Sequence, residues 1–88
     1  MKASPTKHEV KRRLASLITE IAGIPGERVT DAATVAGDLQ MQSVAFVELQ
    51  VAIEEEYNIL VDPLSIVELN DFGAIANYVY DCVVNQVA

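Results

Sequence analysis

Ser43 is the residue whose type and position could carry chemistry. It follows a stretch rich in glycine, threonine and aspartate, and it opens a segment, residues 43–57, that contains no Gly or Pro and is predicted to be helical. Unpaired backbone N–H groups and the positive end of the helix dipole favour a negative charge on a serine oxygen at such a place. A phosphodiester would be stabilised there. An unmodified serine capping the helix fits the position as well, so capping physics alone does not choose between the two.

Other residues offer little for catalysis or metal binding. His8 is the only histidine and falls on the polar side of a predicted helix, and Cys82 is the only cysteine and borders an apolar stripe. One of each cannot build a Cys/His metal site or a disulfide framework. On the polar side of a helix, His8 is expected to be a solvated histidine and not the base of a nucleophilic triad. The glutamates at 54–56 form a run on a helix surface and not a constellation in a pocket. We therefore expect no enzyme activity and no metal.

The predicted helix at 43–57 has two apolar faces. At about 100° per residue, four residues share a face that is expected to enter the core: Phe46, Leu49, Ile53 and Tyr57. On nearly the opposite side, three valines are bordered by three glutamates: Val44, Val47, Glu48, Val51, Glu54 and Glu55. Periodicity alone leaves two interpretations of this second face, a docking surface for a partner or ordinary exposed surface.

Three further segments complete the predicted fold. A first helix is expected from Ser4-Pro5, with Pro5 at its first helical position and Thr6 and Glu9 as a capping box, and it ends at Gly23. A short helical turn runs from Pro63 to Val67, and Asp71 caps a last helix. The apolar stripes of the first and last helices are Val10, Leu14, Leu17, Ile18 and Ile21, and Phe72, Ile75, Ala76, Val79 and Val83.

Between the first two helices, residues 23 to 42 are predicted to form a long loop. Its scattered apolar residues suggest that the loop is pinned to the core: Ile24, Val29, Val35, Leu39 and Met41. Three longer helices and one short helix around one core predict an all-α fold, a small four-helix bundle. The 88 residues, 51% hydrophobic and 22% charged, are expected to form a single domain, 1–88, that folds as a monomer.

Charge is divided unevenly along the chain. Residues 1–28 hold all six Lys and Arg and carry +3, whereas residues 29–88 hold ten Asp and Glu, no base, and carry −10. Such a surface repels nucleic acid and suits partner proteins with Lys and Arg patches. The apolar runs are too short to span a bilayer, so we expect no membrane association and a cytoplasmic location.

The segment from Gln42 to Ile59, QSVAFVELQVAIEEEYNI, resembles the acyl carrier proteins and the related peptidyl carrier proteins, and residues 70–79 resemble the last helix of that family. The resemblance implies a four-helix carrier in which Ser43 receives 4′-phosphopantetheine from coenzyme A, through a separate phosphopantetheinyl transferase that uses magnesium. The terminal thiol of the arm would hold acyl or aminoacyl groups as thioesters. The second helix is the family's main recognition surface, and its matching positions are the valines and glutamates named above.

The sequence departs from the family motif beside the serine. Gln42 replaces the usual acidic residue, Val44 replaces leucine, and Gly37-Asp38 stands where peptidyl carriers have a Gly-Gly pair. Loss of the acidic residue could restrict which transferase modifies Ser43.

The resemblance leads us to expect a discrete acyl carrier that serves an acyltransferase or ketosynthase with basic docking patches, in a polyketide, fatty-acid or related natural-product pathway. Two alternatives remain. One is an aminoacyl or peptidyl carrier loaded by an adenylating ligase. The other is an unmodified interaction module, which Gln42 favours.

Overall fold

The protein is all-helical in the residues that the computed structural model describes, 5–34, 37–39, 41 and 43–87. In chain order these residues form α1 (Lys7–Ala22), the 3-10 turn η1 (Gly26–Arg28), α2 (Ser43–Tyr57), the six-residue α3 (Pro63–Glu68) and α4 (Phe72–Val87). Within these ranges the only β-type pairing is an isolated bridge between Thr34 and Asp71. The predicted all-α class is confirmed.

The ends of α1 follow from local side-chain chemistry. The Glu9 N–H donates to Thr6 Oγ1 at 3.1 Å, and the Thr6 N–H donates to Glu9 Oε1 at 2.8 Å, which confirms the predicted capping box. The prediction that Pro5 occupies the first helical position is wrong, because Thr6, with its extended backbone and its matching Glu9, takes the cap. Ser4 lies outside the described residues. Gly23 ends the helix in the left-handed conformation (φ 71°), where its N–H reaches Thr19 O.

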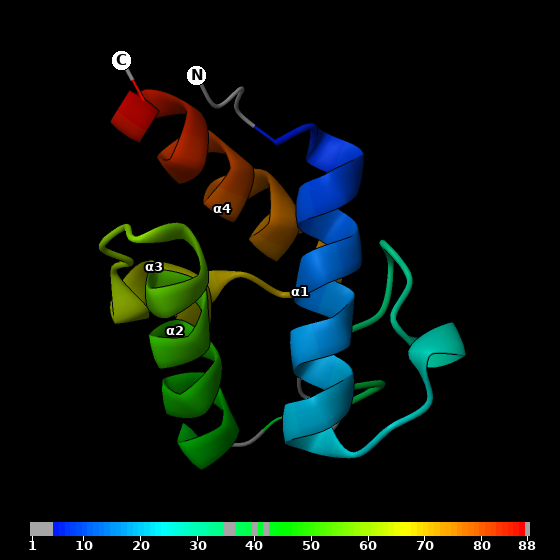
Figure 1. Ribbon diagram of the computed structural model, residues 1–88. Helices are drawn as coiled ribbons and strands as arrows, with labels where there is room; N and C mark the ends of the chain where they lie inside the picture. Colours follow the sequence, from blue (N-terminus) through cyan, green and yellow to red (C-terminus); the bar gives the residue numbers. More distant parts are fainter. Residues whose placement is uncertain (1–4, 35–36, 40, 42, 88) are drawn as a thin grey trace.

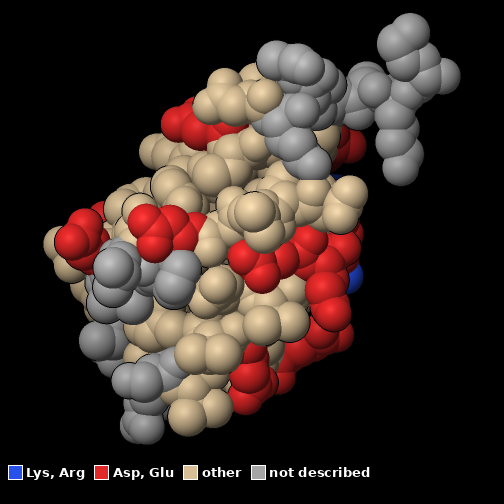
Figure 2. Space-filling view, turned by 90° about the vertical axis from the view of Figure 1, so that its left-hand side faces the viewer, with Lys and Arg blue, Asp and Glu red and all other residues tan. Residues whose placement is uncertain are grey.

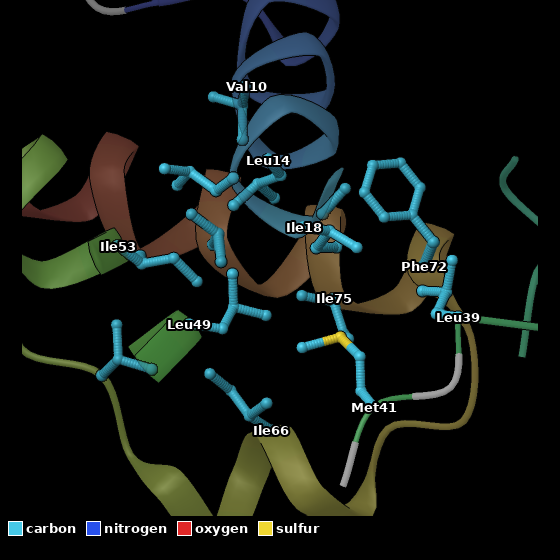
Figure 3. Close-up of a cluster of buried hydrophobic side chains, with 14 of the residues drawn as sticks. Val10, Leu14, Ile18, Leu39, Met41, Leu49, Ile53, Ile66, Phe72 and Ile75 are labelled. Carbon is cyan, nitrogen blue, oxygen red and sulfur yellow. The ribbon is translucent and has the colours of Figure 1, made fainter. Parts of the chain in front are cut away.

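Helix α1 is central to the packing, because it lies against both α2 and α4, while α3 packs on α2 (Figure 1). Their apolar faces meet in one core, to which α1, α2, α3 and α4 all contribute side chains (Figure 3). The predicted stripes of α1 and α4 are buried in that core, except that Ile21 is half-buried against it. On α2 the predicted core face is confirmed for Leu49 and Ile53, and Phe46 and Tyr57 pack at its margin.

The long connection between α1 and α2 is pinned to the core, as predicted. Four of its described residues are buried: Ile24, Ala33, Leu39 and Met41. Two backbone hydrogen bonds join it to the start of α4, from Phe72 N to Ala33 O (3.0 Å) and from Gly73 N to Asp31 O (2.9 Å). The Lys11 ammonium also pairs with the Asp31 carboxylate at 2.9 Å. Val35, which we predicted to help pin the loop, lies outside the described residues.

Helix α4 begins where its sequence indicates. The Ala74 N–H donates to Asp71 Oδ1 at 2.8 Å, so Asp71 caps the helix as predicted. Helix α3 runs one residue beyond the predicted Val67. No helix in the described part of the chain is long and apolar enough to cross a membrane.

Candidate functional site

Ser43 is the first residue of α2, as the sequence predicts. Its side chain and the whole of Gln42 lie outside what the structure describes. The first turn of α2 contains no acidic residue, so no carboxylate there competes with an anion for the N–H groups of the turn. The next residue, Val44, is 71% exposed, so this end of the helix is open to solvent. A serine-linked phosphate fits this position in charge and in access.

The chain just before Ser43 is anchored in the core. Leu39 and Met41 are both buried. Figure 3 shows the Met41 side chain pointing into the cluster that includes Leu49 of α2, Ile66 of α3 and Ile75 of α4. The chain two residues before Ser43 is thus anchored in a core to which α2, α3 and α4 contribute, although it belongs to a long loop.

The outward face of α2 carries the six residues that the sequence predicts as a docking surface, and we call it the valine face: Val44, Val47, Glu48, Val51, Glu54 and Glu55. Its valines are 71%, 59% and 46% exposed in chain order, and Glu48 and Glu55 are exposed as well. Leu49 and Ile53, on the other side of the helix, are fully buried. The structure therefore brings three apolar and two acidic side chains together on the surface, next to Ser43 in sequence.

Glu54 has a structural contact that the sequence analysis missed. It is half-buried, and its Oε2 accepts a hydrogen bond from the Val61 N–H at 2.9 Å. Gln50, one turn earlier, donates from Nε2 to Val61 O at 3.3 Å. Two α2 side chains therefore hold both backbone groups of one residue in the α2–α3 connection. Helical periodicity places Glu54 at the border of the valine face but carries no signal for this contact.

An ion pair joins α1 to the end of α2, far along the helix from Ser43. Arg13 Nη2 lies 2.9 Å from Glu56 Oε1, and this hydrogen bond, together with the negative charge of Glu56, raises the pKa of Arg13. Burial raises the pKa of the neighbouring Tyr57, and the charge of Glu56 adds to the rise. The Arg13–Glu56 pair thus joins α1 to α2.

The other sequence candidates for chemistry are dispersed. His8 is exposed on α1, and Cys82 is half-buried on α4. Among the described residues no three His, Cys, Asp or Glu side chains gather in a way that could hold a metal ion.

The acidic character of the surface is visible on the side where α2, α3 and the end of α4 lie. Figure 2 shows this face with Asp and Glu distributed among uncharged side chains and with Lys and Arg visible only at its edge. Such a face attracts proteins that carry basic patches.

Comparisons with known proteins agree with this arrangement. Residues 12–79 match the family described as "Phosphopantetheine attachment site". The chain is 30% identical over 81 residues to an acyl carrier protein of Cyanidium caldarium, covering 92% of this chain and 94% of the relative. It is also 30% identical over 80 residues to an acyl carrier protein of Acidothermus cellulolyticus, covering 91% and 95%. A meromycolate extension acyl carrier protein of Mycolicibacterium smegmatis is 28% identical over 74 residues, covering 84% and 75%.

Proposed function

Because this chain belongs to the acyl carrier protein family, we propose that Ser43 is the residue that bears its 4′-phosphopantetheine arm. Members of the family are carriers and not enzymes, and the prosthetic group is attached covalently. They interact with a phosphopantetheinyl transferase and with biosynthetic enzymes. The observation that carries the assignment is the position of Ser43, which lies within the matched residues 12–79 and opens α2.

The residues around Ser43 fit an arm joined through a phosphodiester. The helix start supplies backbone N–H groups and no acidic side chain in its first turn, so the phosphate charge is stabilised and not repelled. When bound, the arm supplies a thiol that holds the cargo as a thioester. The protein's own residues anchor the attachment point through buried Leu39 and Met41 and present it beside the valine face.

We further propose an acyl cargo, on a route that builds fatty-acid-like or polyketide chains. The relatives that match this chain are named as acyl carrier proteins, and those of mycobacterial origin are named for meromycolate extension. The partners would be an acyltransferase or a ketosynthase whose Lys and Arg residues meet the acidic surface. In the described residues, the buried side chains of α1, α2, α3 and α4 form one core, which supports a single carrier domain over residues 1–88.

The attachment site is tested by intact mass. Wild type, Ser43→Ala and a matched control, Ser16→Ala on the exposed side of α1, are incubated with coenzyme A, magnesium and a broad-specificity phosphopantetheinyl transferase. We expect one arm on wild type and on Ser16→Ala, and none on Ser43→Ala. An arm on Ser43→Ala would overturn the site assignment. If no protein gains an arm, the Gln42→Asp variant is tested in the same way. No arm on that variant either would favour the unmodified interaction module.

Loading assays decide the class of cargo. The arm-bearing protein is offered to acyltransferases with acyl-coenzyme A donors and, separately, to adenylating ligases with amino acids and ATP. Acyl loading alone supports the proposal. Loading by the ligases alone would make the protein an aminoacyl or peptidyl carrier.

If partner enzymes dock on the valine face, its exposed glutamates should affect transfer. Glu48→Lys and Glu55→Lys each reverse one exposed charge, so we expect slower transfer to partner enzymes, by about three- to tenfold, with the fold intact. Glu20→Lys, an exposed glutamate on α1, is the control that changes net charge equally. Transfer rates are measured at low and at moderate salt. Equal slowing in the Glu20 control would attribute the effect to net charge and not to docking at this face.

A further inference from the structure

Leu60, in the connection between α2 and α3, is the most exposed large hydrophobic residue in the described chain. Its side chain is 90% exposed, more than any valine of the valine face. Single exposed apolar residues are common on protein surfaces and need no explanation by themselves. What distinguishes Leu60 is how firmly the structure holds it and what lies next to it.

The backbone around Leu60 forces its side chain outward. Asn58 adopts the left-handed conformation (φ 55°), and the Ile59 N–H returns to Glu54 O at 3.3 Å, which ends α2. The chain beyond alternates, with Ile59 and Val61 buried in the core and Leu60 between them pointing to solvent. Since the inward positions are taken by its neighbours, the fold requires no apolar residue at position 60.

Side chains from two helices fix this segment in place. Glu54 and Gln50 of α2 bind the N–H and the carbonyl of Val61, at 2.9 and 3.3 Å. Tyr78 of α4 accepts a hydrogen bond from the Asp62 N–H through its hydroxyl oxygen, at 3.1 Å. Leu60 is therefore displayed on an anchored segment, so a partner that contacts it would meet an ordered residue and lose little binding energy to ordering.

A hollow of about 550 Å³ adjoins Leu60, between the α2–α3 connection and the C-terminal half of α4. We call it the Leu60 hollow, and it is lined by Asn58, Ile59, Leu60, Cys82 and Asn85. None of these residues is charged. Two exposed acids lie close to them in sequence: Asp81 directly precedes Cys82, and Asp62 follows Leu60 by two residues. The chain has no Lys or Arg after residue 28, and Figure 2, which faces the side where the connection and the end of α4 lie, shows acids among uncharged atoms.

We propose that the Leu60 hollow is a second docking surface, separate from the valine face, that receives an apolar side chain of a partner protein flanked by Lys or Arg. Leu60 and the apolar lining supply the desolvated centre of the contact. The exposed acids Asp62 and Asp81, and the acidic face on which the hollow lies, favour a basic partner by charge complementarity and disfavour a second copy of this acidic chain. Truncating the Leu60 side chain should weaken partner binding without affecting folding, because this side chain contributes almost nothing to the core.

The test uses the 15N-labelled 88-residue chain and two defined peptides of equal length and charge, an amphipathic Leu/Lys helix and an Ala/Lys helix. We expect the Leu/Lys peptide to shift the amide signals of residues 58–60 and 82–85 and to bind more tightly than the Ala/Lys peptide. Leu60→Ala should weaken Leu/Lys binding by about tenfold, as truncation of a central apolar contact does. Val84→Ala, an exposed apolar residue of α4 outside the hollow, should leave binding unchanged.

Three results would overturn the proposal. Equal binding by wild type and Leu60→Ala would remove Leu60 from the contact. Signal changes confined to residues 44–51 would assign the peptide to the valine face. Self-association that Leu60→Ala abolishes would make a second copy the occupant. None of these readouts depends on loading at Ser43, so the proposal stands or falls apart from the attachment site.

Discussion

At the scale of single residues, Glu54 has two roles, one on the valine face and one in holding the α2–α3 connection. Its position on α2 places it at the edge of the valine face, while its carboxylate accepts the Val61 N–H and so fixes the α2–α3 connection. Substitutions there combine an effect on stability with any effect on docking. Glu48 and Glu55, which are exposed, report on docking more cleanly.

We predict that Glu54→Ala lowers the free energy of unfolding by about 1–2 kcal/mol, because the part-buried Val61 N–H loses its acceptor. Glu54→Gln keeps an acceptor oxygen and should lose less than half as much. Glu55→Ala, on the exposed side of the same turn, is the control and should change stability by no more than about 0.5 kcal/mol. Urea unfolding measures all three. Equal losses for Glu54→Ala and Glu55→Ala would mean that the bond to Val61 contributes nothing.

Tyr57 makes stability depend on alkaline pH. Burial, and then the charge of Glu56, raises its pKa in the folded state above the ordinary value near 10. The folded protein therefore resists ionisation of the phenol, and the resulting stability is complete below the unfolded pKa and is lost as pH rises through the folded one. We expect Tyr57→Phe to reduce the fall in stability above pH 10, relative to wild type. The measurement is denaturant unfolding from pH 9 upward, and an identical pH slope in the two proteins would contradict it.

At the scale of elements, Gly73 shows why the long loop and α4 fit together. A Cβ added at residue 73 would lie 3.1 Å from Asp31 O, the oxygen that accepts the Gly73 N–H. Because that oxygen belongs to backbone and is held by this hydrogen bond, it has little room to move. The close approach of loop and helix depends on the missing side chain.

We predict that Gly73→Ala destabilises the protein, although alanine favours a helix over glycine by about 1 kcal/mol. Gly26→Ala is the matched control, because an added Cβ there would make only an ordinary contact, 3.9 Å from Thr19 Oγ1. It should leave the melting temperature unchanged or raise it slightly. A rise in melting temperature for Gly73→Ala would contradict this prediction, because it would show that the loop at Asp31 can move to accommodate the added Cβ.

Sequence patterns predicted the helices well and the connections less well. The 3.6-residue period identified the buried stripes of α1 and α4, and local chemistry identified the caps at Thr6 and Asp71, because these features depend on residues close in the chain. Pro5 was predicted as the first helical residue, but the helix begins two residues later, at Lys7. The hydrogen bonds from Glu54 and Gln50 to Val61 could not be predicted, since these residues lie seven and eleven positions before it and meet it only in the folded structure.

The same contrast holds for the candidate site. The outward valines of α2 could be identified from residue types and period alone, whereas Ser43 was singled out as an attachment site by the family resemblance of its motif. Leu60 was missed because exposure in a connection depends on which neighbours turn inward, and Ile59 and Val61 are both apolar too.

At the scale of the whole molecule, charge is separated between two parts of the chain. All Lys and Arg lie within residues 1–28, and two ion pairs, Lys11–Asp31 and Arg13–Glu56, join this part to the acidic remainder. Both pairs are partly exposed, so each contributes little to stability. We expect repulsion among the ten acids of residues 29–88 to be the larger effect at neutral pH.

We predict that salt stabilises the protein at pH 7. Raising the ionic strength from about 0.01 M to about 0.15 M shortens the Debye length from roughly 30 Å to 8 Å and screens the repulsion among carboxylates. The melting temperature should therefore rise at pH 7 and change little near pH 4.4, the isoelectric point. A lower melting temperature in salt at pH 7 would mean that the two ion pairs outweigh the repulsion.

The anchoring of the chain ahead of α2 has a consequence for delivery. Leu39 and Met41 are buried before α2, and Leu49 is buried within it. These contacts limit how far the start of α2 can move relative to the core. For an arm attached at Ser43, the volume that its thiol searches is then set by the length of the arm. A docked enzyme meets the cargo at an effective concentration that depends on how far its entrance lies from the bound carrier. Two enzymes with equal affinity for this carrier could therefore receive cargo at very different rates.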